Sequence, residues 1–166
     1  MKKNIYVPLT GTPITLLSGI TFARVPYWFP FYNYKDLKLD LLLPFRPEEG
    51  EKRPLFVWLC GGGFATMERS AYIPWLTYFA KRGYAAASIE YRLSNSAHFP
   101  AQIEDAKKAI RFLRAHADEF RIDPERIAVG ANPPAVIWQL WWVSQTVFLP
   151  LMWENIWNSP AGYRLW

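Results

Sequence analysis

Three consecutive glycines directly follow an apolar run, and they are the first residues in this sequence that could take part in chemistry. The run Leu55–Cys60 reads LFVWLC, and Gly61, Gly62, Gly63 and Phe64 come next. Glycines let the backbone turn so that successive N–H groups face one point, and such a nest binds an anion or a developing oxyanion. A plain flexible turn fits the same residues. A phosphate loop does not, because neither Gly-Lys-Ser/Thr nor G-x-G-x-x-G is present here.

A second candidate position lies just beyond Val129, where another apolar run ends. In sheets of parallel strands, catalytic groups lie on the turns beyond the carboxyl ends of the strands. A nucleophile elbow needs Gly-x-Ser-x-Gly at such a turn. This chain instead reads Ala-Asn-Pro-Pro-Ala over residues 131–135. No hydroxyl is present, and a proline also removes a backbone N–H that could complete an oxyanion hole.

Alternating strand and helix patterns make up the first 130 residues. Apolar runs predict strands within 37–44, 55–60, 84–93 and 121–131. Helical patterns cover 72–83, which has Pro74 near its start and Gly83 at its end, and 99–120. Apolar residues recur on one face of the second helix, at Ile103, Ala106, Ile110, Leu113, Ala117 and Phe120. This order predicts an α/β fold, with a mostly parallel sheet and helices on both faces.

Composition narrows the class of protein. The chain is 51% apolar, which argues against disorder. Its net charge of +5 is spread along residues 1–130 without a Lys/Arg block, so no nucleic-acid partner is expected. One cysteine excludes an internal disulfide, and Pro8 and Pro13 interrupt the apolar N-terminal residues and argue against a signal peptide. These features predict a cytoplasmic protein, and no cofactor or metal ion is expected.

Four segments between Leu37 and Val129 resemble the N-terminal half of an α/β-hydrolase. They read LKLDLLLP, LFVWLCGGGF, LTYFAKRGYAAASIEYRL and FPAQIEDAKKAIRFLRAHADEFRIDPERIAV, in family order and with family spacing. The resemblance is to the esterase/lipase branch, which includes hormone-sensitive-lipase-like and feruloyl-esterase-like members. It implies a carboxylic ester hydrolase that acts on small-molecule esters through a Ser-His-Asp triad. It also implies a partial domain over residues 1–130, truncated after the nucleophile strand.

The same resemblance implies roles for individual residues. Gly62 and Gly63 would supply N–H groups to the oxyanion hole, within a motif that also includes Gly61 and Phe64. Cys60 stands where the family usually has histidine. The nucleophilic serine is expected at the position of Pro133, and neither Asp nor His follows it in this sequence. We therefore expect this chain to lack the triad and to be catalytically inactive.

The resemblance stops after Asn132, and the tail, residues 131–166, differs from the rest of the chain. It holds six of the nine Trp residues but only two charged residues. If one nucleotide is missing after codon 132, the codons of residues 133–137 can spell Ser-Ala-Gly-Gly-Tyr, whereas the other shifted frame cannot encode Ser-Ala. Because Trp has a single codon, some residues of the restored frame are fixed whatever the other codons are. The codons of Trp138 and Gln139 must yield Ala, and those of Trp142 and Val143 must yield Gly. We therefore interpret the tail as family sequence read out of frame.

Three alternative interpretations belong to other classes of protein. The Trp-rich tail has the composition of a membrane-interface anchor, although basic residues on a polar face are missing. It also has the aromatic residues of a partner-binding segment. Cys60 could be a nucleophile if a base lay nearby, whereas its simpler interpretation is a small buried residue at a strand end. His98 and His116 precede the elbow, match no catalytic position of the family and are interpreted as structural.

Overall fold

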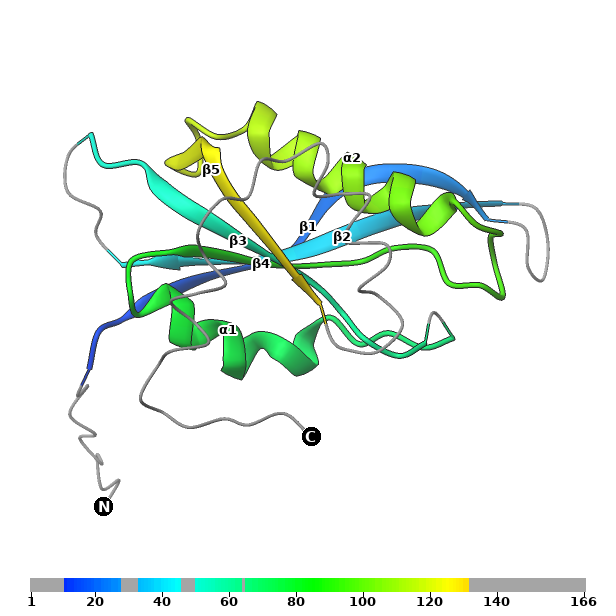
Figure 1. The fold of residues 1–166 in the computed structure, drawn as a ribbon, viewed down its shortest axis with the longest axis horizontal. Helices are drawn as coiled ribbons and strands as arrows, with labels where there is room; N and C mark the ends of the chain where they lie inside the picture. The colour runs from blue at the N-terminus through cyan, green and yellow to red at the C-terminus, as the bar shows by residue number, and fades with distance from the viewer. Residues whose placement is uncertain (1–10, 28–32, 46–49, 64, 132–166) are drawn as a thin grey trace, which may run out of the picture.

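The computed structural model describes residues 11–27, 33–45, 50–63 and 65–131 (Figure 1). The elements in chain order are β1 (Ile14–Tyr27), β2 (Asn33–Pro44), β3 (Arg53–Leu59), a short 3-10 turn (Ser70–Tyr72), α1 (Ile73–Ala80), β4 (Ala85–Ile89), α2 (Ala101–Ala115) and β5 (Ile122–Ala131). The strands form one sheet in the order β1-β2-β4-β3-β5. Figure 1 shows α1 on one face of this sheet and α2 on the other. The predicted α/β fold with helices on both faces is confirmed.

Strands β3, β4 and β5 run parallel to one another at the centre and at one edge of the sheet. Strand β2 pairs antiparallel with both β4 and β1, so the sheet is mixed. A parallel pair needs a crossover connection, and α1 and α2 supply the two crossovers of this part of the chain. The carboxyl ends of β3 and β5 therefore lie side by side, at the edge of the sheet that is formed by the ends of the parallel strands, with Leu59 opposite Ala131.

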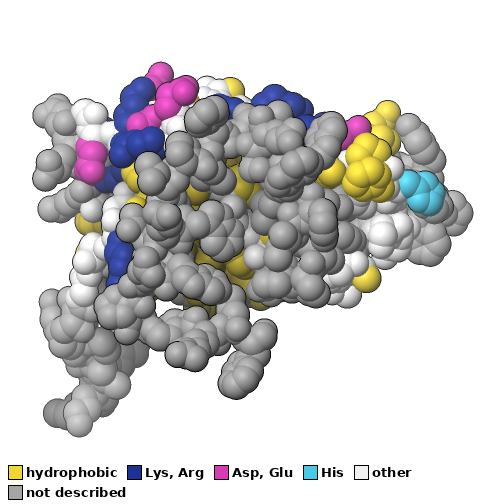
Figure 2. All heavy atoms as spheres, in the orientation of Figure 1, with side chains coloured by type: hydrophobic (Ala, Val, Ile, Leu, Met, Phe, Trp, Pro, Cys, Tyr) yellow, Lys and Arg dark blue, Asp and Glu magenta, His cyan; other side chains and the backbone are white. Residues whose placement is uncertain are grey.

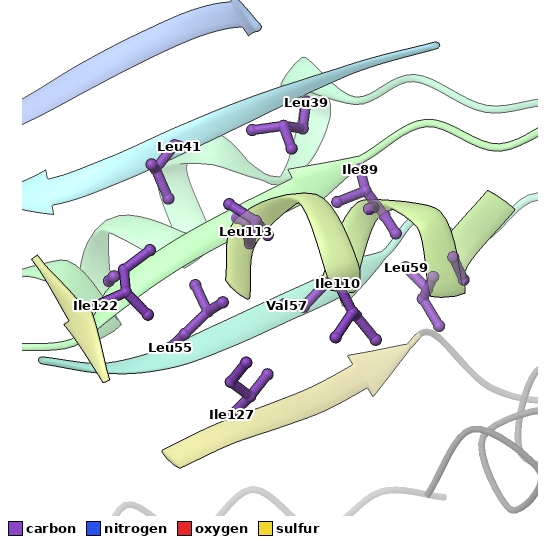
Figure 3. Close-up of a cluster of buried hydrophobic side chains, with 14 of the residues drawn as sticks. Leu39, Leu41, Leu55, Val57, Leu59, Ile89, Ile110, Leu113, Ile122 and Ile127 are labelled. Atoms are coloured by element: carbon purple, nitrogen blue, oxygen red, sulfur yellow. The ribbon is translucent and has the colours of Figure 1, made fainter. Parts of the chain in front are cut away.

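Strand β3 is buried on both of its faces, as its continuous apolar run predicted. Leu55, Val57 and Leu59 pack in the core beneath α2, whereas Phe56 and Trp58 pack with residues of α1 on the opposite face. Figure 3 shows Leu55 and Val57 among the side chains of the larger core. The apolar residues predicted for one face of the second helix are all buried in this core. Ile103, Ala106, Ile110 and Leu113 lie on α2, whereas Ala117 and Phe120 lie in the turn after it, because α2 ends at Ala115 and not at the predicted residue 120.

Strand β1 was not predicted from the sequence. It pairs with β2 from Ile14 opposite Pro44 to Tyr27 opposite Asn33, but the register shifts twice within it. Gly19 lies at the first of these irregularities and adopts a φ of 74°. A bulge inserts an unpaired residue and so interrupts the two-residue period on which strand prediction depends. The irregular pairing explains why the apolar alternation of β1 is not visible in the sequence.

Charged side chains of both signs lie together on the surface. Figure 2 shows Lys and Arg side chains beside Asp and Glu side chains along one edge of the molecule. Lys52, just before β3, lies 2.7 Å from Asp118 in the turn after α2, whereas Arg126 and Asp123, which are 2.6 Å apart, both lie in β5. Such exposed pairs contribute little to stability, on the order of 0–1 kcal/mol each.

Candidate active site

The candidate site lies at the edge of the sheet where β3 and β5 end. The glycine loop, here residues 60–63 and 65–69, begins directly after β3. Because Leu59 lies opposite Ala131 in the parallel pair, the loop starts beside the end of β5. The sequence placed its two candidate positions just after these two strands, and only the first of them, the glycine loop, lies within the described residues. Phe64, Pro133 and the rest of the Trp-rich tail from residue 132 onward lie outside the described residues.

The turn within the glycine loop requires glycine at position 62. Gly62 has a φ of 141° and Gly63 a φ of 61°, both in the region that side chains disfavour. The Gly62 carbonyl oxygen accepts hydrogen bonds from the N–H groups of Ala65, at 3.1 Å, and Thr66, at 3.2 Å. A Cβ atom on Gly62 would lie 2.1 Å from the Thr66 carbonyl oxygen. The loop therefore folds back on itself at a point where no other residue fits.

Cys60 is fully buried at the end of β3. Its Sγ atom lies 3.2 Å from Ser88 Oγ, whose own hydrogen is donated to the Arg69 carbonyl oxygen at 2.9 Å, so the thiol is the donor to Ser88. Burial is the largest influence on the pKa of the Cys60 thiol and raises it, and the nearby Arg69 charge opposes this only in part. The thiol is therefore protonated at neutral pH, which makes it a poor nucleophile.

Tyr91 contacts the first peptide of the glycine loop. Its side chain is buried, and its hydroxyl donates a hydrogen bond to the Cys60 carbonyl oxygen. Burial, together with the nearby Cys60 and Tyr72, raises the pKa of the Tyr91 phenol to about 12. The phenol therefore keeps its proton across the physiological pH range and remains a donor.

Arg69 anchors the other end of the glycine loop. Its Nη1 atom lies 2.5 Å from Glu90 Oε1, and its Nε atom lies 2.7 Å from Asp40 Oδ2. The second pair is not aligned for a hydrogen bond, so the contact is an ion pair. The other oxygen of Asp40 accepts hydrogen bonds from Ser18 Oγ at 2.7 Å and from the Gly19 N–H at 2.9 Å. Charge on Arg69 is thus balanced by two carboxylates from β2 and the end of β4.

The Asp40 carboxylate, which contacts Arg69, makes the stability of the fold depend on pH. Burial acts to raise the pKa of Asp40, but the contacts with Arg69, Ser18 and Gly19 outweigh it and lower that pKa below the ordinary 3.8. A carboxyl whose pKa is lower in the folded state stabilises the fold above its unfolded pKa, and this contribution is lost as pH falls through the folded pKa. We expect Asp40→Asn to lower the free energy of unfolding by about 1–3 kcal/mol near neutral pH.

Urea denaturation between pH 7 and pH 3 measures this contribution. The gap between the parent chain and Asp40→Asn should be constant down to about pH 4 and shrink below it. Asp36, which is 49% exposed and lies 3.6 Å from Arg24, is the matched carboxylate on the same strand. Its replacement by asparagine should cost less than about 0.5 kcal/mol. A gap for Asp40→Asn that stays unchanged down to pH 3 would contradict the assignment.

His116 does not lie at this site. His116 caps the end of α2, and its Nδ1 atom lies 2.9 Å from the Phe112 carbonyl oxygen. The segment after α2 runs to the beginning of β3, where the Arg53 N–H donates to the Arg121 carbonyl oxygen at 3.0 Å. That is the opposite edge of the sheet from Cys60. His98 is exposed in the loop before α2.

Asp40, Arg69, Ser88 and Tyr91 were not singled out from the sequence. They come from β2, the loop after β3 and the end of β4, so only the fold brings them together. Asp40 alone carried a signal, because it is the one charged residue in the apolar half of LKLDLLLP. A charge at a position predicted to be buried implies a partner of opposite sign.

The described residues include neither a membrane-spanning helix nor a candidate metal site. None of their helices is both long and apolar enough to cross a membrane. They also contain no group of three or more His, Cys, Asp or Glu side chains placed to hold a metal ion.

Comparison with known proteins identifies the family to which the chain belongs. A family model, BD-FAE, matches residues 39–132, which is more than half of the chain. The chain is 34% identical over 103 residues to carboxylic ester hydrolase LipN of Mycobacterium tuberculosis, covering 58% of this chain and 27% of that protein. It is 35% identical over 94 residues to rat neutral cholesterol ester hydrolase 1, covering 54% and 23%.

Solved structures give the same class. Esterase Est2 of Thermogutta terrifontis matches with a TM-score of 0.59 and 28% identity, over 74% of this chain and 40% of the esterase. A bacterial heroin esterase matches with a TM-score of 0.56 and 29% identity, over 75% and 36%. The chain belongs to the BD-FAE family, within the esterase/lipase branch of the α/β-hydrolases. It spans about a quarter of the length of the curated relatives it matches.

Proposed function

We propose that this chain carries the oxyanion-binding part of a carboxylic ester hydrolase, and that the chain as written does not hydrolyse esters. The observation that carries the proposal is the glycine loop, which starts at the end of β3 beside the end of β5. In an ester hydrolase, a serine activated by histidine and aspartate attacks the ester carbonyl, and backbone N–H groups stabilise the negatively charged oxygen that forms.

Gly62 and Gly63 are the residues proposed to donate to that oxygen. Both are exposed, whereas Cys60 before them is buried, so this part of the loop faces solvent at the sheet edge. Their φ values of 141° and 61° show that the backbone turns sharply at both residues. The substrates proposed are small-molecule esters, in keeping with the named activity of LipN as a carboxylic ester hydrolase.

Pro133 is the reason for the proposed inactivity. It follows the end of β5 by two residues, at the position that the family resemblance assigns to the nucleophilic serine. Proline has no hydroxyl to form an acyl-enzyme and no N–H to donate to an oxyanion. We propose that one nucleotide is missing after codon 132, because restoring it permits Ser-Ala-Gly-Gly at residues 133–136. Sequencing of the DNA around that codon tests this step directly.

Hydrolysis of p-nitrophenyl acetate tests the proposed activity. The chain as written is compared with a version in which the nucleotide after codon 132 is restored. We expect turnover that is sensitive to a serine-directed inhibitor in the restored version only, because only that version has a nucleophile. The matched control is the restored version with alanine in place of the regained serine, and it should be as inactive as the unrestored chain.

Two results would contradict the proposal. Inhibitor-sensitive turnover by the unrestored chain would mean that a nucleophile other than the residue at position 133 is at work. A DNA sequence whose neighbouring frame does not encode Ser-Ala-Gly-Gly after codon 132 would remove the frameshift.

A further inference from the structure

A run of three glycines does not by itself hold an oxyanion site in one fixed conformation. Glycine has the widest backbone freedom of all residues, so residues 61–63 lose more conformational entropy on ordering than other residues would. Stabilisation of an oxyanion, however, depends on donors that already point the right way before the reaction. The residues that hold the glycine loop in one conformation are therefore part of how the proposed site would work.

The start of the glycine loop is held by a buried hydrogen bond. The Tyr91 hydroxyl donates to the Cys60 carbonyl oxygen, and both residues are at most 3% exposed. That carbonyl and the Gly61 N–H belong to one peptide unit, which is planar and trans. Fixing the direction of the carbonyl thus fixes the direction of the first N–H group of the loop, on the opposite side of the same plane.

The end of the glycine loop is also held by residues at the carboxyl end of β4. Ser88 Oγ donates to the Arg69 carbonyl oxygen at 2.9 Å, and Glu90 pairs with the Arg69 guanidinium. Ser88, Glu90 and Tyr91 all lie at the carboxyl end of β4 or directly after it. Both ends of the loop are therefore attached to residues 88–91, and the turn at Gly62 closes between them.

We propose that Tyr91 is a positioning residue for the glycine loop. Its hydroxyl sets the plane of the Cys60–Gly61 peptide and keeps the loop closed, so that the N–H groups of Gly61 to Gly63 hold one direction. The relevance of this to catalysis rests on the proposed function, whereas the effect on the loop does not. Without the hydroxyl, the buried Cys60 carbonyl loses a donor, and the glycines that follow are held only by the contacts at the other end of the loop.

Amide hydrogen exchange of the full chain, followed by NMR, tests the proposal. The Ala65 and Thr66 N–H groups report on loop closure, because both are bonded to the Gly62 carbonyl oxygen. In Tyr91→Phe their exchange should become about 10-fold faster, the change that follows from the loss of one hydrogen bond. Amides of the β3 core, such as that of Val57, report on global unfolding and should accelerate by no more than the same factor. Tyr78→Phe is the matched control, since Tyr78 is 49% exposed on α1.

The pattern of exchange separates positioning from general destabilisation. Unchanged rates at Ala65 and Thr66 in Tyr91→Phe would overturn the proposal. Ile110→Val lowers the stability of the core away from the glycine loop, so it should accelerate exchange of the Val57 amide and leave Ala65 and Thr66 at the parent rate. Equal acceleration of Ala65 and Thr66 in Ile110→Val and in Tyr91→Phe would also overturn the proposal, because Tyr91 would then act through global stability alone. Acceleration at these two amides that neither Ile110→Val nor Tyr78→Phe reproduces supports it.

Kinetics of the nucleotide-restored version provide the second readout. There Tyr91→Phe should lower kcat about 10-fold and leave KM within about 2-fold, because oxyanion donors act in the transition state and not on the bound ester. A fall in kcat/KM that arises from KM alone would overturn the positioning role. If the restored version has no esterase activity, the proposed function fails, and the exchange result still decides whether Tyr91 holds the loop.

Discussion

Replacement of Asp105 by alanine is expected to lower the free energy of unfolding by about 3–5 kcal/mol, because it leaves a buried charge without its partner. Asp105 is fully buried on α2. Its Oδ2 atom accepts from the Arg92 Nε at 2.8 Å and from the Arg92 backbone N–H at 3.0 Å, and its Oδ1 atom accepts from Arg92 Nη2 at 2.9 Å. Lys108 adds a weaker contact at 3.3 Å. The pair joins the segment after β4 to α2.

Urea denaturation measures this loss, and Glu104→Gln is the matched control. Glu104 precedes Asp105 on the same helix and lies 3.5 Å from the same guanidinium, but its side chain is 57% exposed. Its replacement should cost less than about 1 kcal/mol. Adding Arg92→Met to Asp105→Ala removes the stranded charge and should restore part of the lost stability. If the double variant is no more stable than Asp105→Ala alone, the loss does not come from an unpaired buried charge.

Most of the fold was predictable from the sequence, because burial leaves a periodic or continuous apolar pattern. The strand at Leu55–Cys60 and the helix containing Ile110 were predicted and are present as β3 and α2. The strand predicted over 84–93 is shorter, and β4 covers only Ala85–Ile89. Of the residues that follow, Glu90 still bonds to β2, since its N–H donates to the Lys38 carbonyl oxygen at 2.9 Å, whereas the Arg92 side chain is bonded to Asp105 of α2. Apolar content alone does not reveal such tertiary contacts.

The candidate site was only partly predictable. The glycines and their place beside the end of β5 follow from motif and strand order, since parallel strands end at one edge of a sheet. The residues that hold the glycine loop could not be predicted in this way. Tyr91 and Arg69 lie 22 positions apart in the sequence, and only the fold brings both to the carboxyl end of β4. Family resemblance points to the residues that would touch substrate, whereas the supporting contacts become visible only in three dimensions.

Substitution of Gly62 by alanine is expected to have the largest effect on the proposed oxyanion site. The new Cβ atom would lie 2.1 Å from the Thr66 carbonyl oxygen, which is backbone and cannot move aside as a flexible side chain can. The turn at Gly62 must therefore open, and the hydrogen bonds from Ala65 and Thr66 to its carbonyl must break or lengthen. In the nucleotide-restored version kcat should fall about 10²–10³-fold, the loss that follows when one oxyanion donor is removed.

Gly63→Ala is the control that separates loop shape from the mere presence of a methyl group. No atom lies within 4 Å of a Cβ at Gly63, and its φ of 61° is one that alanine adopts at a cost of about 1–2 kcal/mol. Both variants keep every N–H group, so any difference between them reports on the direction of those groups. In the unrestored chain, Gly62→Ala should also abolish the exchange protection of the Thr66 amide. Equal kcat values for the two variants would mean that the closed turn at Gly62 does not position the oxyanion donors.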